Sequence, residues 1–353
     1  MAHKLTKPKV GESPTFIEGE HGPSSAPQDH VQHHRDVWAR YWGSRDMKGP
    51  GLCWEEVEAS PKLNPERLRK TASTFGVNTS AADGWHPRMF SELSDEALQG
   101  LSDIYHMIEL VGNFPSDHQT LLVRLIPKPN SLESRPIGLY KGLFRLWAKR
   151  RTDALRSWSR EHPEAAKFIN TLPGRQTLDG VWRAQLQGYL DQSEGLEAAE
   201  VMWDVRTCYE HVSHAKLADQ ARAQNYPLQL LRVSIASYGW ERQVIGDLNI
   251  MAAPVLPGAG IVAGSSMATF EIAMYMQAEL GSTVKKHDIG LSVHIDDLSI
   301  SATAGNGRDL AKLIVPALVD VKAALGFLDL PVAPPSRWCF ARPRKELEPS
   351  RPP

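Results

Sequence analysis

The sequence has little cysteine and no excess of charge of either sign. Its 353 residues include three cysteines, Cys53, Cys208 and Cys339, which lie far apart and form no Cys-x-x-Cys pair. A disulfide framework and a zinc module are therefore not expected, whereas a reducing intracellular environment is. The formal net charge is −1, so the overall composition does not indicate binding to nucleic-acid phosphates, and charge must be judged locally.

Long hydrophobic runs are absent as well. The longest apolar stretch, residues 250–264, is interrupted by Pro254, Pro257 and three glycines, which leaves it unable to cross a bilayer. The N-terminus shows no pattern of a signal peptide. We therefore expect a cytoplasmic or nuclear protein with no membrane partner.

Hydrophobic periodicity predicts a mixture of helices and short strands. Residues 1–28 and the Pro- and Arg-rich tail 342–353 have no periodicity and are expected to be disordered. Helices are expected over 30–42, 61–80, 94–110, 139–158, 174–190, 215–224, 228–238, 267–280 and 308–325. Strands are expected over 121–126, 199–205 and 244–251, with two more within 289–300.

Acidic residues occur at two places where β-forming runs end. Asp204 closes the run 199–205, and Asp296 and Asp297 interrupt the run 289–300. Adjacent carboxylates repel each other, so bound Mg²⁺ would be a natural partner for them. The alternative is an ordinary polar hairpin turn, because aspartate is a favoured turn residue.

Phosphoryl transfer by two metal ions requires carboxylates of this kind. One ion activates the attacking hydroxyl, and the other holds the triphosphate and the leaving oxygen. Six short elements in a fixed order add to the carboxylates. They are Asp83-Gly84 with Pro115; Leu125–Pro129 with Arg135-Pro136-Ile137; Gly174–Thr177 with Asp179; Asp204–Val212; Gly260 with Gly264–Ser266; and His294–Leu298.

Together these elements resemble the reverse transcriptase (RNA-directed DNA polymerase) domain of non-LTR retroelements. The resemblance implies an α+β right-hand polymerase fold. After an N-terminal extension, residues 1–50, it implies helical fingers over 51–198 and a ferredoxin-like palm with an antiparallel sheet over 199–341. Because the chain ends soon after Asp297, we expect the thumb to be absent.

The resemblance also implies roles for the carboxylates and their neighbours. Asp204 and Asp296 would bind two Mg²⁺ ions, with Asp297 assisting and Mn²⁺ as an alternative ion. Lys128 and Arg135 would clamp the triphosphate of an incoming dNTP. Without the resemblance, these two residues would be interpreted as an exposed basic turn.

Further roles concern the sugar and the nucleic acid. Tyr209 would lie under the nucleotide sugar and exclude a ribose 2′-hydroxyl, although it could also be a core tyrosine. The backbone at Gly264 would approach the templating base closely. Arg175 would contact phosphate. Seven basic residues between 141 and 160 would contact an RNA or DNA template with its primer, or else form a solvated helix face; Lys149, Arg150 and Arg151 are the central ones.

The pattern departs from the family at three positions. His294 stands where an aromatic residue is usual, Ala263 stands where glutamine is usual, and residues 331–337 contain no lysine, only Arg337. The predicted function is RNA-directed DNA polymerisation. One alternative is a decayed retroelement remnant that only binds nucleic acid. Another is an RNA-dependent RNA polymerase, against which Tyr209 and the lack of an asparagine in the element at Gly260 and Gly264–Ser266 argue.

Overall fold

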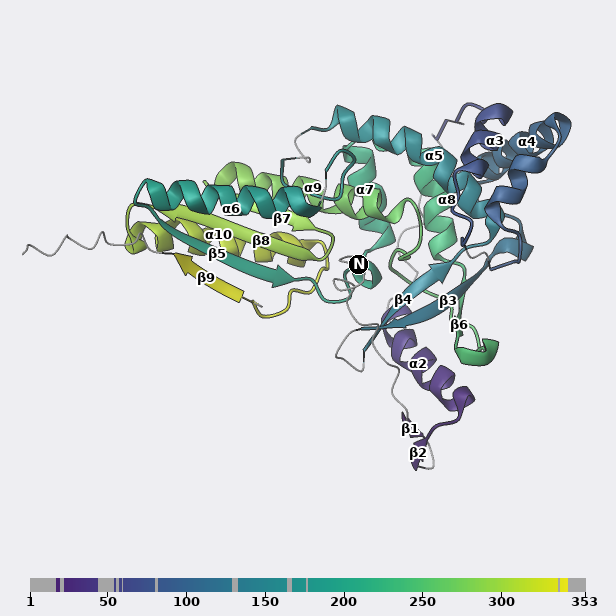
Figure 1. Ribbon diagram of the computed structural model, residues 1–353, viewed down its shortest axis with the longest axis horizontal. Coiled ribbons are helices and arrows are strands. Elements are labelled where there is room, and N and C mark those ends of the chain that lie inside the picture. Colours follow the sequence, from purple (N-terminus) through teal and green to yellow (C-terminus); the bar gives the residue numbers. More distant parts are fainter. Residues whose placement is uncertain are drawn as a thin grey trace, which may run out of the picture. The chain divides into compact units, whose positions relative to one another are not determined.

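The computed structural model describes residues 17–19, 22–43, 54, 57–58, 60–79, 82–128, 133–163, 167–175, 177–335 and 337–341 (Figure 1). The expected α+β class is confirmed, because helices alternate with three small sheets in this described part of the chain. The chain forms two compact units. The first comprises Met1–Leu155 and Asn225–Ala268, and the second comprises Arg156–Gln224 and Thr269–Pro353.

These units do not coincide with the expected division between residues 198 and 199. The segment Asn225–Ala268 belongs with the N-terminal part, and Arg156–Gln224 belongs with the C-terminal part. The division into compact units does not test which residues act as fingers and which as palm, so these two assignments stay predictions. No helix among the described residues is both long and apolar enough to cross a membrane.

The first unit is mostly helical and contains a three-stranded sheet in the order β4-β3-β6. Strand β3 pairs antiparallel with β4 and parallel with β6. Its elements are β1 (Ile17–Gly19), β2 (Gly22–Ser24), α2 (Pro27–Trp42), α3 (Pro65–Ser73), η1 (Pro87–Glu92), α4 (Asp95–Val111), η2 (Ser116–His118), β3 (Thr120–Pro127), β4 (Ser134–Leu139), α5 (Gly142–Glu161, which runs into the second unit), α8 (Leu228–Tyr238), β6 (Glu241–Ile245) and η5 (Asp247–Asn249).

Aromatic rings form the centre of the first unit. Tyr140 stacks on Phe144 with ring centroids 4.1 Å apart, and Phe144 also contacts Trp147 and Trp240. Both oxygens of the Asp83 carboxylate accept a hydrogen bond from the backbone N–H of Gly142, over 3.1 and 3.2 Å. The Asp83-Gly84 loop therefore caps the N-terminus of α5, a local role for a pair that the resemblance had singled out.

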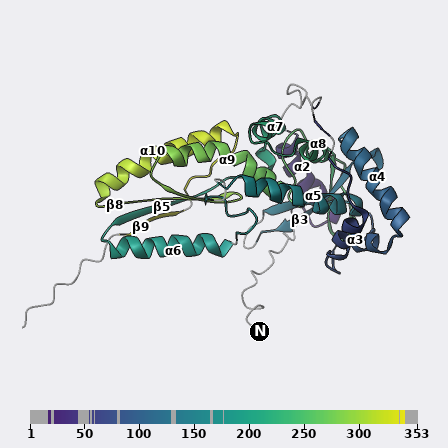
Figure 2. The ribbon, with the colours of Figure 1, turned by 90° about the horizontal axis from the view of Figure 1, so that it is seen from above.

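The second unit is built on a four-stranded antiparallel sheet in the order β7-β8-β5-β9. Helices α9 and α10 lie on one face of this sheet, and α6 lies on the other (Figure 2). The elements of the unit are α6 (Thr177–Ser193), β5 (Glu197–Asp204), η4 (Cys208–His211), α7 (His214–Ala223), α9 (Ala268–Lys286), β7 (Gly290–His294), β8 (Asp297–Ala304), α10 (Gly307–Phe327) and β9 (Arg337–Ala341).

The two faces of this sheet differ because apolar and polar side chains alternate along its strands. Val201, Trp203, Leu298 and Ile300 are buried on the face covered by α10. The opposite face carries residues of the other parity, among them the acidic ends of β5 and β8. Burial of one face therefore directs the acidic residues to the other.

Several sequence predictions need correction. The segment 1–28, expected to be disordered, contains the β1–β2 hairpin and the start of α2 among its described residues. Strand β6 ends at Ile245 instead of continuing to 251, because Leu248 and Asn249 adopt left-handed backbone with φ of 56° and 59°. Strands β4 and β9 were not predicted. Residues 1–16 and 342–353 lie outside the described part.

Candidate active site

Asp204 and Asp297 meet at the acidic end of the second unit's sheet. Asp204 is the last residue of β5, Asp297 is the first of β8, and the two are register partners. Side chains directly opposite in an antiparallel pair share a face, with Cβ atoms about 5 Å apart. The structure therefore brings together two of the three carboxylates predicted from sequence.

Asp296 lies in the turn that precedes β8. Pairing of His294 with Asp297 closes a two-residue turn formed by Ile295 and Asp296. Ile295 has a φ of 61°, a left-handed conformation that is unusual for a β-branched residue and costs about 1–3 kcal/mol. Such strain is typical of functional sites, and here it sets the orientation of the acidic turn.

The backbone around these residues is tied together by strand-like hydrogen bonds. The N–H of Val205 donates to the carbonyl of Asp296 over 2.8 Å, and the N–H of Ala333 donates to the carbonyl of Asp204 over 2.9 Å. Val205 also bridges to Val332. Residues 331–333 therefore hold the end of β5 in place; they belong to the segment 331–337, in which the lysine expected from the resemblance is missing.

Negative charge is concentrated beside this turn. Burial raises the pKa of the Cys208 thiol well above its ordinary value, and the charges of Asp296, Glu210 and Asp204 raise it further. Burial also raises the pKa of the Tyr209 phenol, followed by the effects of Cys208, Asp296 and Glu271. Both groups consequently stay protonated at neutral pH, and Cys208 is an inert thiol.

The carboxylates suit a cation of a particular kind. Within the residues that the structure describes, no three His, Cys, Asp or Glu side chains form a ready-made metal cage. Mg²⁺ in phosphoryl-transfer sites is usually bound by one or two carboxylates together with substrate phosphates. The opposed pair Asp204 and Asp297, with Asp296 in the adjoining turn, fits such an open site.

The predicted triphosphate ligands lie on the β3–β4 hairpin of the first unit. Ile126 pairs with Arg135 in the register, and the Lys128 N–H donates to the carbonyl of Glu133. The Lys128 ammonium forms a 2.6 Å ion pair with the exposed Glu133 carboxylate. Arg135 is exposed. Its guanidinium has no hydrogen bond or ion pair within the described chain. Their role in binding triphosphate stays a prediction.

Gly264 has a structural role in the first unit that sequence reasoning did not identify. Its φ is 112°, and a Cβ placed on it would lie 2.3 Å from the carbonyl oxygen of Gly138. The N–H of Gly138 donates to the carbonyl of Ala263 over 2.7 Å. Glycine is thus required here for close packing of a loop against β4. The approach of this backbone to a templating base stays a prediction.

The basic residues of α5 have contacts of their own. Arg151 forms a bidentate ion pair with Glu109, whose carboxylate is completely buried. Arg150 pairs with Asp153, and Lys149 lies 4.1 Å from the ring centroid of Phe75. The structure therefore gives Arg151 a packing role, and nucleic-acid binding by these residues stays a prediction.

Arg175 follows the predicted turn at Gly174, which has a φ of 84°. The Nη1 atom of Arg175 is buried and has no hydrogen-bond partner in the described part of the chain. A buried guanidinium nitrogen of this kind is suited to donate a hydrogen bond to an anionic ligand. Gln176, which belongs to the same motif, lies outside the described residues.

Sequence reasoning missed Glu271. This residue is fully buried in the first turn of α9, and its charge contributes to the raised pKa of Tyr209. A single acid within the otherwise apolar run 267–276 was the available signal, because carboxylates are rarely buried without a reason.

Comparisons with known proteins add little to this geometry. No protein-family model matches the chain. Among solved structures, it has a weak similarity to telomerase from Candida albicans in complex with the TWJ fragment of telomeric RNA, with 11% identity and a TM-score of 0.44. The match covers 66% of this chain and 43% of that chain. At this level the similarity carries no argument about function.

Proposed function

We propose that this chain is a template-dependent nucleotidyltransferase of the reverse transcriptase class, an RNA-directed DNA polymerase. The observation that supports this most is the register between Asp204 and Asp297, which places opposed carboxylates beside a strained acidic turn. In the proposal the second unit's sheet is the palm, and the helical first unit contributes to the fingers.

The chain's own residues would perform three tasks. Asp204, Asp296 and Asp297 would hold Mg²⁺, which when bound supplies charge neutralisation at the triphosphate and activation of the attacking hydroxyl. Tyr209, held neutral by its raised pKa, would fill the space beside the nucleotide sugar as an uncharged bulky group. Lys128 and Arg135 would bind the triphosphate.

In the proposed reaction the 3′-hydroxyl oxygen of a primer bonds to the α-phosphorus of a dNTP. The bond from that phosphorus to the bridging oxygen breaks, pyrophosphate leaves, and the hydroxyl proton passes to water. Residues that meet substrate only at the reacting phosphate act mainly in the transition state, so their loss is expected to lower kcat.

The test is primer extension on a primed RNA template with Mg²⁺, in which either dNTPs or NTPs are supplied. We expect extension with dNTPs and a loss of about 100-fold or more in Asp204→Asn and in Asp296→Asn. Asp288→Asn is the matched control, because this exposed residue lies on the same unit, just before β7.

Each outcome is decisive for the proposal. Extension with NTPs alone would assign the chain to the RNA-dependent RNA polymerases. Failure to use either substrate, with template binding retained, would identify a fold that binds nucleic acid without catalysis. Equal activity in the Asp204 and Asp288 variants would exclude the carboxylate site.

A further inference from the structure

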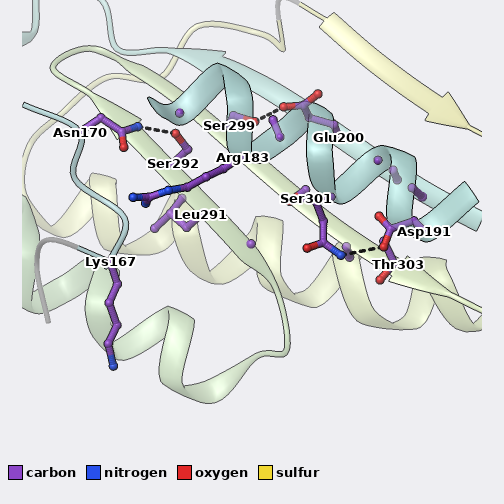
Figure 3. A pocket seen from close by; sticks show the side chains of 18 residues that line it. Lys167, Asn170, Arg183, Asp191, Glu200, Leu291, Ser292, Ser299, Ser301 and Thr303 are labelled. Atoms are coloured by element: carbon purple, nitrogen blue, oxygen red, sulfur yellow. Dashed lines mark hydrogen bonds between the residues drawn. The ribbon is translucent and has the colours of Figure 1, made fainter. Parts of the chain in front are cut away.

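A cavity of about 380 Å³ lies within the second unit, between α6 and the polar face of the sheet (Figure 3). Its floor comes from β5, β8 and β7, and its roof is α6. It begins two residues along β8 from Asp297 and extends away from the acidic end. The cavity is therefore separate from the proposed catalytic carboxylates, although it shares their face of the sheet.

The cavity exists because α6 presents small residues to the sheet. Gly180, Ala184 and Gly188 recur once per turn along its inner side and line the space. Large apolar side chains of the helix point elsewhere: Trp182 is 68% exposed and Tyr189 is 71% exposed. Helix packing normally buries the apolar side and fills such gaps. The space between α6 and the sheet is therefore an open cavity lined by polar groups, where packed apolar side chains would be expected.

Several polar atoms that face this space have no hydrogen-bond partner within the described part of the chain. Glu200 uses Oε1 to accept the hydroxyl of Ser299, and no hydrogen bond to its Oε2 occurs in the described chain. Within the described chain, no hydrogen bond is made by three further side-chain groups either: the hydroxyls of Ser301 and Thr303 and the guanidinium of Arg183. Groups of this kind are available to a ligand.

The charges are separated along the cavity. Figure 3 shows Arg183 and Lys167 toward the end marked by Asn170, while Asp191 lies at the opposite end. The carboxylate of Asp191 is buried and accepts a 2.8 Å hydrogen bond from Gln187. An occupant would therefore carry an anionic group at one end and hydroxyl donors along the serine-lined floor.

We propose that this cavity binds a sugar phosphate, with ribose 5-phosphate as the smallest complete form. The phosphate lies at Arg183, and adjacent sugar hydroxyls donate to Glu200 Oε2 and exchange hydrogen bonds with Ser301. Among the described residues no aromatic side chain lines the space, so the sugar and phosphate, rather than a stacked base, supply the recognition. The volume falls within the usual range for small-molecule sites.

The experiment is calorimetric titration of the intact chain with ribose 5-phosphate, with AMP, and with ribose or inorganic phosphate alone. We expect saturable binding of ribose 5-phosphate and weaker binding of either half. AMP binding as tight as that of ribose 5-phosphate indicates a free nucleotide as the source. Exclusion of AMP with retention of ribose 5-phosphate indicates a free sugar phosphate. Both results support the proposal.

Substitutions in α6 and in the sheet test whether the ligand binds in the cavity or elsewhere on the surface. A Cβ on Gly188 meets nothing within 4 Å, so Gly188→Leu fills the cavity without a backbone clash and should abolish binding. Gly188→Ala is the matched control and should retain it. Arg183→Gln and Glu200→Gln each remove one charge-assisted interaction, and each should weaken binding about 10-fold or more.

Circular dichroism verifies that Gly188→Leu is folded before its binding is compared. Absence of binding for all probes at millimolar concentration would overturn the proposal, as would binding that Gly188→Leu leaves unchanged. Primer extension is not measured in this experiment, so its result is independent of the proposed polymerase activity.

Discussion

Asp204 and Asp297 face each other as direct partners across the antiparallel strands β5 and β8. Like charges in this arrangement repel, and each such pair destabilises a sheet by about 0.2–1 kcal/mol. In the proposed metal site a bound cation would relieve this repulsion, so its effect on stability is measurable without any assay of activity.

The first prediction concerns this repulsion. Asp297→Asn should raise the free energy of unfolding by about 0.5 kcal/mol when no divalent ion is present, because one of the opposed charges is removed. Addition of Mg²⁺ should stabilise the unmodified protein more than the variant. Urea unfolding with and without MgCl₂ measures both effects, and Asp288→Asn should show neither. A variant that is less stable than the parent protein would contradict the repulsion.

The second prediction concerns selection of the sugar and rests on the proposed polymerase activity. Tyr209→Ala should raise the use of NTPs relative to dNTPs by about 10-fold or more, because the bulk that excludes a 2′-hydroxyl is removed. Tyr209→Phe should retain the selectivity, since the phenol is uncharged in the parent protein. The measurement is the ratio of kcat/KM with NTPs to kcat/KM with dNTPs, compared between the two variants and the parent protein.

The third prediction concerns the buried ion pair of the first unit. Arg151→Ala should lower the free energy of unfolding by about 3–5 kcal/mol, because it leaves the completely buried carboxylate of Glu109 without its cation. Arg160→Ala, an exposed change in the same helix, should stay within about 0.5 kcal/mol. If the two substitutions change the free energy of chemical unfolding equally, the ion pair between Arg151 and Glu109 contributes nothing to stability.

The fourth prediction concerns the contact between Gly264 and Gly138. Gly264→Ala should destabilise the protein by about 3 kcal/mol, since its Cβ would lie 2.3 Å from a carbonyl oxygen and the positive φ disfavours any side chain. Gly239→Ala is the control, because a Cβ there meets only ordinary contacts, the nearest at 3.5 Å. Thermal unfolding compares the two, and a Gly264→Ala protein as stable as the control would refute the close packing.

The fifth prediction concerns acid stability. The side-chain hydrogen bond from Lys286, followed by that from His287, holds the pKa of Asp320 below its ordinary value and links α9 to α10. Because the folded state binds this proton less readily, the stabilisation is present above the ordinary aspartate pKa of about 3.9 and is lost as the pH falls further.

An NMR titration of the Asp320 carboxyl should therefore have its midpoint below the ordinary aspartate pKa of about 3.9. Asp320→Asn should remove the corresponding part of the pH dependence of unfolding. A midpoint at or above the ordinary value would show that the links to Lys286 and His287 do not form in solution.

The sequence alone determined the local elements of this protein. Apolar periodicity correctly located most helices. The acidic interruption of the run 289–300 correctly predicted a hairpin turn between two strands, but the turn expected at Asp296 and Asp297 lies at Ile295 and Asp296, and Asp297 begins β8. These features depend on neighbours within a few residues, so composition and spacing are sufficient to indicate them.

Only the tertiary structure decided which distant residues meet. Whether Asp204 faces Asp297 depends on the strand register, because a shift of one residue would move the side chains of one strand to the other face of the sheet. The pairing of Arg151 with Glu109 depends on how two helices pack. The same holds for α6, which presents small residues to the sheet while Trp182 is exposed, the reverse of the usual pattern. Long-range packing selects among many partners that local sequence leaves equally available, and for that reason the opposed carboxylates and the cavity became visible only in the folded chain.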